Sequence, residues 1–451
     1  MFERLKLFIA DDPSWAAFAA AVFAMGFSLP LARAFIVISL ILSAIPSLTK
    51  RDPFRRSLPA TGWIVYLILA IAVTTVMAVV NTDPLIVPKT GLKKLPKLLW
   101  YITIPLTITQ VNSTERFYTI LKILIAGCLF SALSVIFLNP LYALLQVNWP
   151  AEITAPVNET EKMLIKWADR FRMTKGINSW VYKGYRAPDY IASLLKLGTM
   201  QDAQRLMVAF PASLCLFIDS KRDNLSGKLR IASLITTILL FCGLLLTFKR
   251  GPLFFSLFAC GVILLKYLGT KGIVALSLGC ILFMAHPALR QRLADLPDEF
   301  STARGGRALM WTRIVPAVHK EHPFGIGFRA LTNEKMRQHG PRVEQRQNHV
   351  HSTPLQSFVD FGWLGVIAYI FWMGAALTAT IRSLLKTRSK GFKQPSVRYV
   401  PLAMLSTLLL YGLIEYNLAN ADVVLLYSLS MGLGTFIFSK GQYSKNAAPL
   451  R

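Results

Sequence analysis

Long apolar runs separated by polar connections dominate the chain. A helix needs roughly 20 apolar residues to cross the hydrocarbon core of a bilayer. About twelve runs are candidate spans, with approximate limits 14–30, 31–49, 60–80, 96–111, 117–138, 204–219, 230–248, 252–268, 272–286, 354–381, 399–417 and 421–439. The pattern predicts an all-α, polytopic membrane protein with about 12 transmembrane helices, forming a single transmembrane domain over residues 1–451.

Charge in the short connections predicts the orientation of these spans. With twelve spans, three basic connections share one side with both termini, namely Lys50, Arg51, Arg55 and Arg56; Lys221, Arg222, Lys228 and Arg230; and Arg382, Lys386, Arg388, Lys390, Lys393 and Arg398. The positive-inside rule makes that side cytoplasmic. Two long segments, 139–203 and 287–353, then face the other side, which is the periplasm if the source is a Gram-negative bacterium.

Composition narrows the class of protein further. The hydrophobic fraction is 54%, and the formal net charge is +27. These values exclude a soluble globular enzyme, a disordered chain and a coiled coil. A nucleic-acid-binding protein could share the charge but not the apolar runs, so we expect no nucleic-acid partner.

Both long periplasmic segments invite a functional interpretation. Segment 287–353 has more Lys and Arg than acidic residues, which indicates an anionic partner such as a phosphate, a diphosphate or lipid headgroups, or else a solvated basic surface. In segment 139–203, Met163, Trp167 and Phe171 share one helical face. This spacing predicts an interfacial helix, or equally a scaffold helix packed on the spans.

Two basic motifs are candidates for binding phosphate groups. Lys249-Arg250-Gly251-Pro252 joins two apolar runs at the outer rim, where snorkelling side chains are the alternative interpretation. Gly305-Gly306-Arg307 precedes a helical pattern, and glycines there let backbone N–H groups approach an anion. Another outer cluster, Lys89, Lys93, Lys94 and Lys97, could contact lipid phosphates or simply solvate a loop.

All six histidines lie between residues 286 and 351. His349 and His351 precede Thr353-Pro354-Leu355-Gln356, which reads as a capping box at the start of a membrane helix. A neutral imidazole at the rim can accept a hydroxyl proton as a general base, whereas a polar linker would only form local hydrogen bonds. A zinc site from His319, His322, His349 and His351 lacks a supporting carboxylate or thiolate pattern, so we expect no metal.

Four motifs in order resemble the O-antigen ligase and polymerase superfamily of bacterial inner membranes. They are Lys249-Arg250-Gly251; Gly306-Arg307 with Trp311; Glu321-His322-Pro323-Phe324-Gly325-Ile326-Gly327; and His349-Val350-His351 with Leu355-Gln356 and Phe361-Gly362-Trp363-Leu364-Gly365. Members often have Asn after the second histidine, where this chain has Ser352.

The resemblance implies a GT-C-like glycosyltransferase with a periplasmic site, acting without metal or cofactor and with inversion. The implied donor is O-antigen on undecaprenyl diphosphate, and for the ligase branch the acceptor is a sugar hydroxyl of lipid A-core, with membrane lipids as further partners. His349 or His351 would be the base, while Arg250 and Arg307 would hold the diphosphate. Further candidate substrate-binding residues are Lys249, Arg304, Arg186, Arg205, Gln356, Glu415, Lys93 and Lys94. Glu415 could instead orient an arginine or cap a helix.

Several alternatives remain open at this point. The nearest is an O-antigen polymerase, although basic outer loops suit the two phosphate-rich lipids of a ligase better. A protein O-oligosaccharyltransferase is less favoured because the chain ends soon after its last predicted span. From a different class, a transporter or flippase would place charged groups along a path at mid-membrane, where these spans have few. A membrane scaffold is the remaining alternative.

Overall fold

The computed structural model describes residues 12–50, 58–138, 199–222, 227–247, 249–272, 306–341, 343, 348–386, 396–418 and 420–443, with isolated positions between 274 and 297. These residues form helices and no strand, which confirms the all-α prediction for them. The predicted interfacial helix around Trp167, most of the 272–286 span, Arg186 and Arg304 lie outside the described residues.

The chain separates into two compact units that interleave along the sequence. Unit 1 comprises Met1–Arg51, Glu115–Arg290 and Gln394–Val400, and unit 2 comprises Asp52–Thr114, Gln291–Lys393 and Pro401–Arg451. Each is described by itself below.

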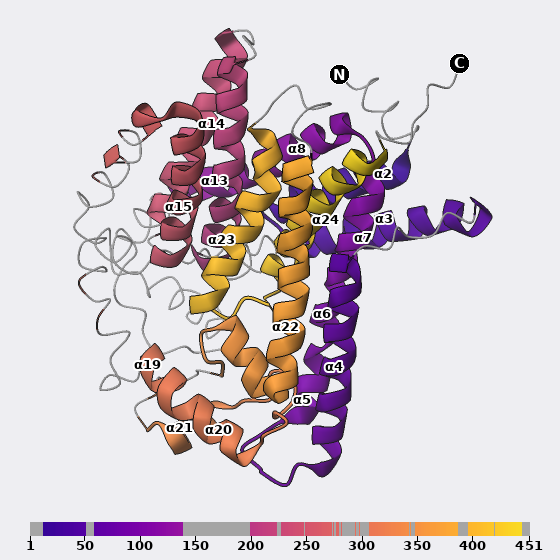
Figure 1. The fold of residues 1–451 in the computed structure, drawn as a ribbon, viewed down its shortest axis with the longest axis vertical. Helices are drawn as coiled ribbons and strands as arrows, with labels where there is room; N and C mark the ends of the chain where they lie inside the picture. Colours follow the sequence, from indigo (N-terminus) through magenta and orange to yellow (C-terminus); the bar gives the residue numbers. More distant parts are fainter. Residues whose placement is uncertain are drawn as a thin grey trace, which may run out of the picture. The chain divides into compact units, whose positions relative to one another are not determined.

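Unit 1 is built from long helices and the shorter α2. They are α2 (Pro13–Met25), α3 (Leu29–Lys50), α8 (Thr114–Leu133) with the π-helical turn Ser134–Leu138, α13 (Thr199–Arg222), α14 (Gly227–Leu246) and α15 (Arg250–Leu268). Figure 1 shows α13, α14 and α15 side by side. Helix α13 is more polar than its neighbours, and most of its residues are buried within the protein.

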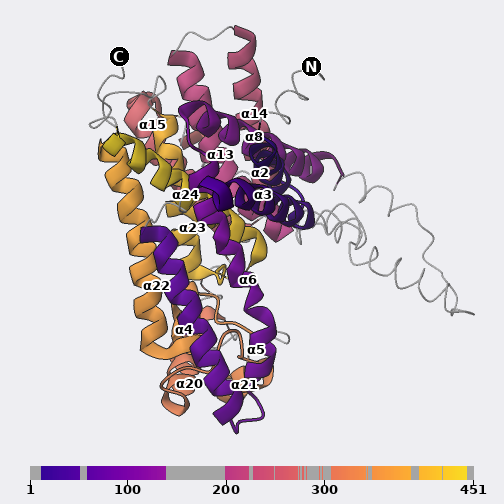
Figure 2. The ribbon, with the colours of Figure 1, turned by 90° about the vertical axis from the view of Figure 1, so that its right-hand side faces the viewer.

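Unit 2 contains the remaining helices. They are α4 (Leu58–Val80), α5 (Pro88–Lys94), α6 (Pro96–Leu99), α7 (Thr103–Gln110), α19 (Arg307–Leu309), α20 (Val315–Glu321), α21 (Asn333–His339), α22 (Thr353–Lys386), α23 (Val400–Ile414) and α24 (Ala421–Tyr443). Helix α4 runs along α22 in both views (Figures 1 and 2).

The predicted spans agree well with these helices. Every predicted span other than 272–286 coincides with a helix or with consecutive helices. Six described helices are long and apolar enough to cross a membrane, namely Thr61–Val80, Thr114–Phe137, Gly227–Leu246, Arg250–Leu268, Thr353–Leu385 and Val397–Ile414. The number of crossings and their orientation stay predictions.

Helix α22 opens near its start, where two of the sequence motifs meet. The backbone N–H groups of Ile326 and Gly327 donate to the carbonyls of Val359 and Asp360, at 3.1 and 2.9 Å. Gly362 follows with a φ of 61°, a conformation that glycine adopts without strain. A Cβ atom there would lie 2.5 Å from the carbonyl oxygen of Pro323. The glycines of both motifs therefore allow one close backbone contact that bends α22.

The short helices α19, α20 and α21 share a small apolar core with the start of α22. This core includes Leu309, Ile314, Val318, Ile326, Leu331, Met336, Val350 and Val359. Two hydrogen bonds join it to α4 and to the connection after α4: the Thr74 hydroxyl accepts from the Phe328 N–H at 2.9 Å, and the Thr332 hydroxyl donates to the Leu85 carbonyl at 2.6 Å.

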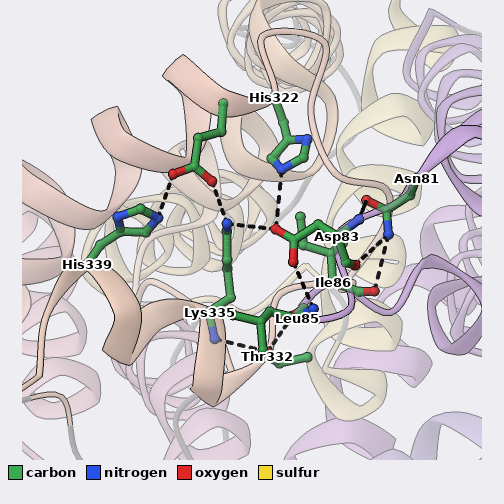
Figure 3. Close-up of polar contacts among 9 residues, drawn as sticks. Asn81, Asp83, Leu85, Ile86, His322, Thr332, Lys335 and His339 are labelled. Carbon is green, nitrogen blue, oxygen red and sulfur yellow. Dashed lines mark hydrogen bonds and ion pairs between the residues drawn. The ribbon is translucent and has the colours of Figure 1, made fainter.

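A buried lysine strengthens this docking (Figure 3). The Lys335 side chain is only 2% exposed, and its ammonium donates to the carboxylates of Asp83, at 2.7 Å, and Glu321. These bonds hold the pKa of both carboxyls below their usual range, although burial of Asp83 opposes the shift, and they raise the pKa of Lys335 against its own desolvation. His322 and His339 flank the two acids, as the figure shows.

Replacing this lysine is expected to destabilise unit 2. In Lys335→Met two carboxylates lose their shared cation, so the free energy of unfolding should fall by about 1–3 kcal/mol, less than for a fully buried pair because Glu321 is partly exposed. The exposed Lys89→Met is the matched control and should change it by less than about 0.5 kcal/mol. Thermal or denaturant unfolding in detergent measures both.

The pH dependence of the stability difference between wild type and Lys335→Met is a second measurement. The pKa values of Asp83 and Glu321 are lower in the folded state than in the unfolded state. The two carboxylates therefore stabilise the fold fully above their unfolded pKa values, near pH 4, and this stabilisation is lost as the pH falls through their folded pKa values. The wild type and Lys335→Met should therefore converge in stability as pH is lowered from about 5 to 3. A difference that stays constant over that range would contradict the ion-pair explanation.

Candidate active site

The carboxylate of Glu415 lies at the centre of a polar cluster in unit 2. Its Oε1 atom is 3.0 Å from Nδ1 of His351 and 3.5 Å from Nε2 of His349. Its Oε2 atom is 3.6 Å from a terminal nitrogen of the Arg307 guanidinium. Glu415 follows the last residue of α23 directly, so the cluster lies where this candidate span ends.

The histidine-bearing loop is held by hydrogen bonds on both sides of Val350. Its carbonyl accepts from the indole N–H of Trp311 at 2.7 Å, and its N–H donates to Oε1 of Gln356 at 2.9 Å. The next residue, His351, has a φ of 48°, which is uncommon for a residue other than glycine. These bonds fix the backbone between the two imidazoles, whose ring centroids are 4.4 Å apart.

Gln356 has a different role from the one its sequence position indicated. We expected a substrate contact, or a capping box in which its side chain returns to the residue starting the helix. Its side chain is instead fully buried, accepts from Val350 and donates to Oδ1 of Asp360 at 2.7 Å. Since a carboxylate only accepts hydrogen bonds, Asp360 orients the amide so that its oxygen faces Val350. We therefore interpret Gln356 as positioning the histidine loop.

Thr353, the first residue of α22, also differs from its expected capping role. Its hydroxyl is 3.0 Å from both the Glu415 carbonyl and Oδ1 of Asn417, and it accepts from the Asn417 N–H at 3.2 Å. The start of α22 is thereby joined to the residues after α23. This contact fixes the backbone that carries the central carboxylate.

The electrostatics of the cluster favour a charged carboxylate beside neutral imidazole. Burial alone would raise the pKa of Glu415, but ring N–H donors from His349 and His351 hold that pKa well below its usual range. Burial lowers the pKa of His349, against the opposing effect of Glu415. At neutral pH Glu415 is therefore an anion, and His349 donates to it as a neutral ring.

Two residues that we had not assigned to the site border this cluster. The Tyr416 ring lies 5.9 Å from that of His349, and the Arg329 guanidinium is 5.6 Å from the Tyr416 ring centroid. Among the described residues the buried Tyr416 hydroxyl has no hydrogen-bond partner, which an arriving polar ligand could supply. Arg329 has a φ of 49°, and Lys94 donates to its carbonyl at 3.1 Å. Local sequence carries no signal for this long-range placement.

The other expected site residues fall in several places. Lys94 supports the Arg329 backbone, whereas Lys93 is exposed on α5. Lys249 and Arg250 lie at the start of α15 in unit 1. Arg205, also in unit 1, is fully buried and pairs with Asp202 at 3.3 Å, so we assign it a packing role.

The histidines do not gather as the zinc alternative required. His319 packs its ring against Phe358, with centroids 4.3 Å apart, and His322 lies beside Asp83. His349, His351 and Glu415 have potential ligand atoms within 4.8 Å of one another and could hold a metal ion. Arg307 already compensates the Glu415 charge, which weakens this possibility without excluding it.

One comparison with known proteins is informative about this region. Residues 235–370 match the family described as O-Antigen ligase. No curated protein matches the chain. The matched range includes Arg250, Arg307, His349 and His351, and ends before Glu415. Together with the long apolar helices, this match supports a membrane protein of the O-antigen ligase and polymerase superfamily.

Proposed function

We propose that the protein is an O-antigen ligase of the Gram-negative inner membrane. It transfers O-antigen from undecaprenyl diphosphate to a sugar hydroxyl of lipid A-core at the periplasmic face, with both termini in the cytoplasm. The family match supports the class of enzyme. The observation that carries the chemical part is the contact of Glu415 with two imidazoles and a guanidinium where a candidate span ends.

The proposed general base is His351. With Nδ1 donating to Glu415 at 3.0 Å, the neutral ring has its lone pair on Nε2, which can take the proton of the acceptor hydroxyl. His349 has both ring nitrogens near oxygen atoms, Nε2 near Glu415 and Nδ1 3.1 Å from the Asn348 side chain. We assign His349 the role of holding Glu415.

Arg307 is the proposed partner of the departing diphosphate. Arg307 is the first residue of α19. Backbone N–H groups at the start of a helix also favour an anion. A diphosphate leaves as a stable anion, so the arginine stabilises the charge that develops as the glycosidic bond breaks. Arg250, at the start of α15 in unit 1, stays a candidate diphosphate-binding residue on the strength of its sequence motif.

The proposed reaction is inverting and needs no metal. One base activates the acceptor hydroxyl, which attacks the anomeric carbon from the side opposite the diphosphate. The proton passes to His351, and the bond to the diphosphate oxygen breaks with its electron pair. Glu415 stabilises the imidazolium that forms, because an adjacent carboxylate favours the charged ring.

The first experiment tests this activity with purified protein in lipid nanodiscs. Lipid-linked O-antigen and lipid A-core are combined with EDTA and without nucleotide, and a ladder on the core is the expected product. His351→Ala should lower kcat by about 10²–10⁴-fold, and His349→Ala by clearly less, because only His351 is the base. Equal losses in both variants would contradict this assignment.

Other products would identify the alternatives. Longer chains on the lipid carrier without transfer to the core would indicate a polymerase. Loss of activity in EDTA with recovery on adding zinc would favour a metal held by the His349, His351 and Glu415 cluster. No product from folded protein in either assay would favour a transporter or a scaffold.

Arg307→Lys tests the diphosphate contact. Lysine keeps the charge but loses the planar fork that binds two phosphate oxygens at once, so kcat/KM for the donor should fall by about 10–100-fold. The matched control is Arg313→Lys at an exposed position six residues along, which should stay within about twofold of wild type. An equally mild effect of both substitutions would remove Arg307 from the mechanism.

Gln356→Leu tests the positioning of the histidine loop. Without the amide, the buried Val350 N–H loses its acceptor and the loop can shift, so kcat should fall by about 10²-fold while KM for either substrate changes little. Exposed Gln338→Leu serves as the control. A rise in KM with unchanged kcat would instead support the direct substrate contact that the sequence had indicated.

A further inference from the structure

A pocket of about 280 Å³ lies beside the Lys335 cluster of unit 2, at the end of α4. One side is apolar and comes from Met77 and Val80 in the last turn of α4, together with Phe324. The other side is polar and includes Asn81, Thr82, Glu321 and His322. Because α4 is a candidate span that ends at Val80, the pocket lies at the rim where this span leaves the membrane.

Phe324 gives this pocket an unusual feature. Its side chain is 77% exposed, and among the described residues 306–352 it is the one large hydrophobic side chain left so exposed. The adjoining turn is held in place, since the N–H groups of Ile326 and Gly327 donate to carbonyls in the opened part of α22. The backbone that carries the aromatic ring is therefore fixed beside hydrogen-bonding groups.

The polar wall can accept hydrogen bonds but has little room for a cation. Asp83, Glu321 and His322 have potential ligand atoms close enough together to hold a metal ion. The Lys335 ammonium, however, already lies between the two carboxylates (Figure 3). A second cation there would meet direct repulsion. A carboxylate offers about four lone-pair sites. Glu321 accepts a hydrogen bond from Lys335 at one of them, and Nε2 of His339 lies 3.1 Å from its other oxygen. It can still accept from hydroxyl groups.

We propose that this pocket binds a single sugar ring of the glycan substrate, which rests on the ligase or polymerase activity proposed above. A pyranose has an apolar face of C–H groups and a rim of hydroxyl groups. Its face would stack on Phe324, and its hydroxyls would donate to Glu321 and exchange hydrogen bonds with Thr82 and His322. The volume is at the lower limit of ligand pockets, roughly 300 Å³, which fits one ring and excludes a long glycan.

The position of the pocket suits such a ligand better than a lipid chain. An acyl chain would desolvate the remaining lone pairs of Glu321 without offering a hydrogen bond in return, which is unfavourable. A glycan attached to a membrane lipid must instead pass the rim where the span ends. The ring could belong to the donor or to the acceptor, and the experiment separates these sources.

The test uses the full-length protein in nanodiscs and substitutions of Phe324. Phe324→Ala and Phe324→Leu should raise KM for one substrate, donor or acceptor, by about three- to tenfold, with kcat within about twofold, while Phe324→Trp keeps the flat ring and stays near wild type. Leu99→Ala, another exposed apolar residue of unit 2, is the matched control. The substrate whose KM rises identifies the source of the sugar.

A binding measurement keeps this inference distinct from the proposed activity. Free O-antigen polysaccharide and lipid-free core oligosaccharide, both released by mild acid, are titrated against wild type and Phe324→Ala while saturation-transfer NMR follows sugar protons. Weaker binding of either glycan to the variant supports the pocket even if no transfer is found. Unchanged KM values and unchanged binding in Phe324→Ala overturn the proposal. So does a Phe324→Leu variant that equals wild type when Phe324→Ala is impaired, because the ring would then be a membrane anchor.

Discussion

The backbone contact between the Gly325–Gly327 turn and the opened start of α22 organises the candidate site. Two helix carbonyls that lose their intrahelical donors are satisfied by Ile326 and Gly327 instead. Just before the bend, Asp360 lies one helical turn after Gln356 and binds its side chain, and Gln356 in turn holds Val350 between the two histidines. The same turn carries Phe324 on one side and leads to Arg329 on the other. A Cβ atom at Gly325 would lie 2.4 Å from the Asp360 carbonyl oxygen, and one at Gly362 would lie 2.5 Å from the Pro323 carbonyl oxygen. Both motifs therefore depend on glycine.

Acidic side chains have a consistent role in this basic protein. Three carboxylates of unit 2 join segments that are separate in sequence. Asp83 and Glu321 meet on Lys335, and Glu415 meets His349, His351 and Arg307. Lys and Arg side chains outnumber Asp and Glu in this protein and repel one another. The few carboxylates therefore determine which cations lie near each other and in what geometry. The positions of acids are therefore more informative about this site than the general basic excess of the segment.

The sequence predicts some of these features well and others not at all. Apolar runs of membrane length mark most helices, because the hydrophobic requirement of a span is local along the chain. His349, His351, Arg307 and Glu415 could each be selected from their place near the end of an apolar run or at a helix start. Their convergence could not, since it depends on how α19, α22 and α23 pack. Gln356 was misinterpreted for the same reason: a capping box is a local pattern, and here the tertiary partners Val350 and Asp360 take its side chain instead.

Tertiary packing also explains why the matched family domain does not contain the whole cluster. The range 235–370 supplies both imidazoles and Arg307, whereas the carboxylate that contacts them comes from the end of α23, beyond that range. An imidazole with a partner on Nδ1 has a defined tautomer and ring orientation, and one without it does not. The residue that determines how His351 can act is thus contributed by the later part of unit 2, held there by the Thr353 contact with Glu415 and Asn417. Other chains carrying this domain must supply an equivalent acceptor from their own last helices if their second histidine works as a base. Because a helix end at the membrane rim is the nearest scaffold, a carboxylate directly after a late span is the feature to seek in them.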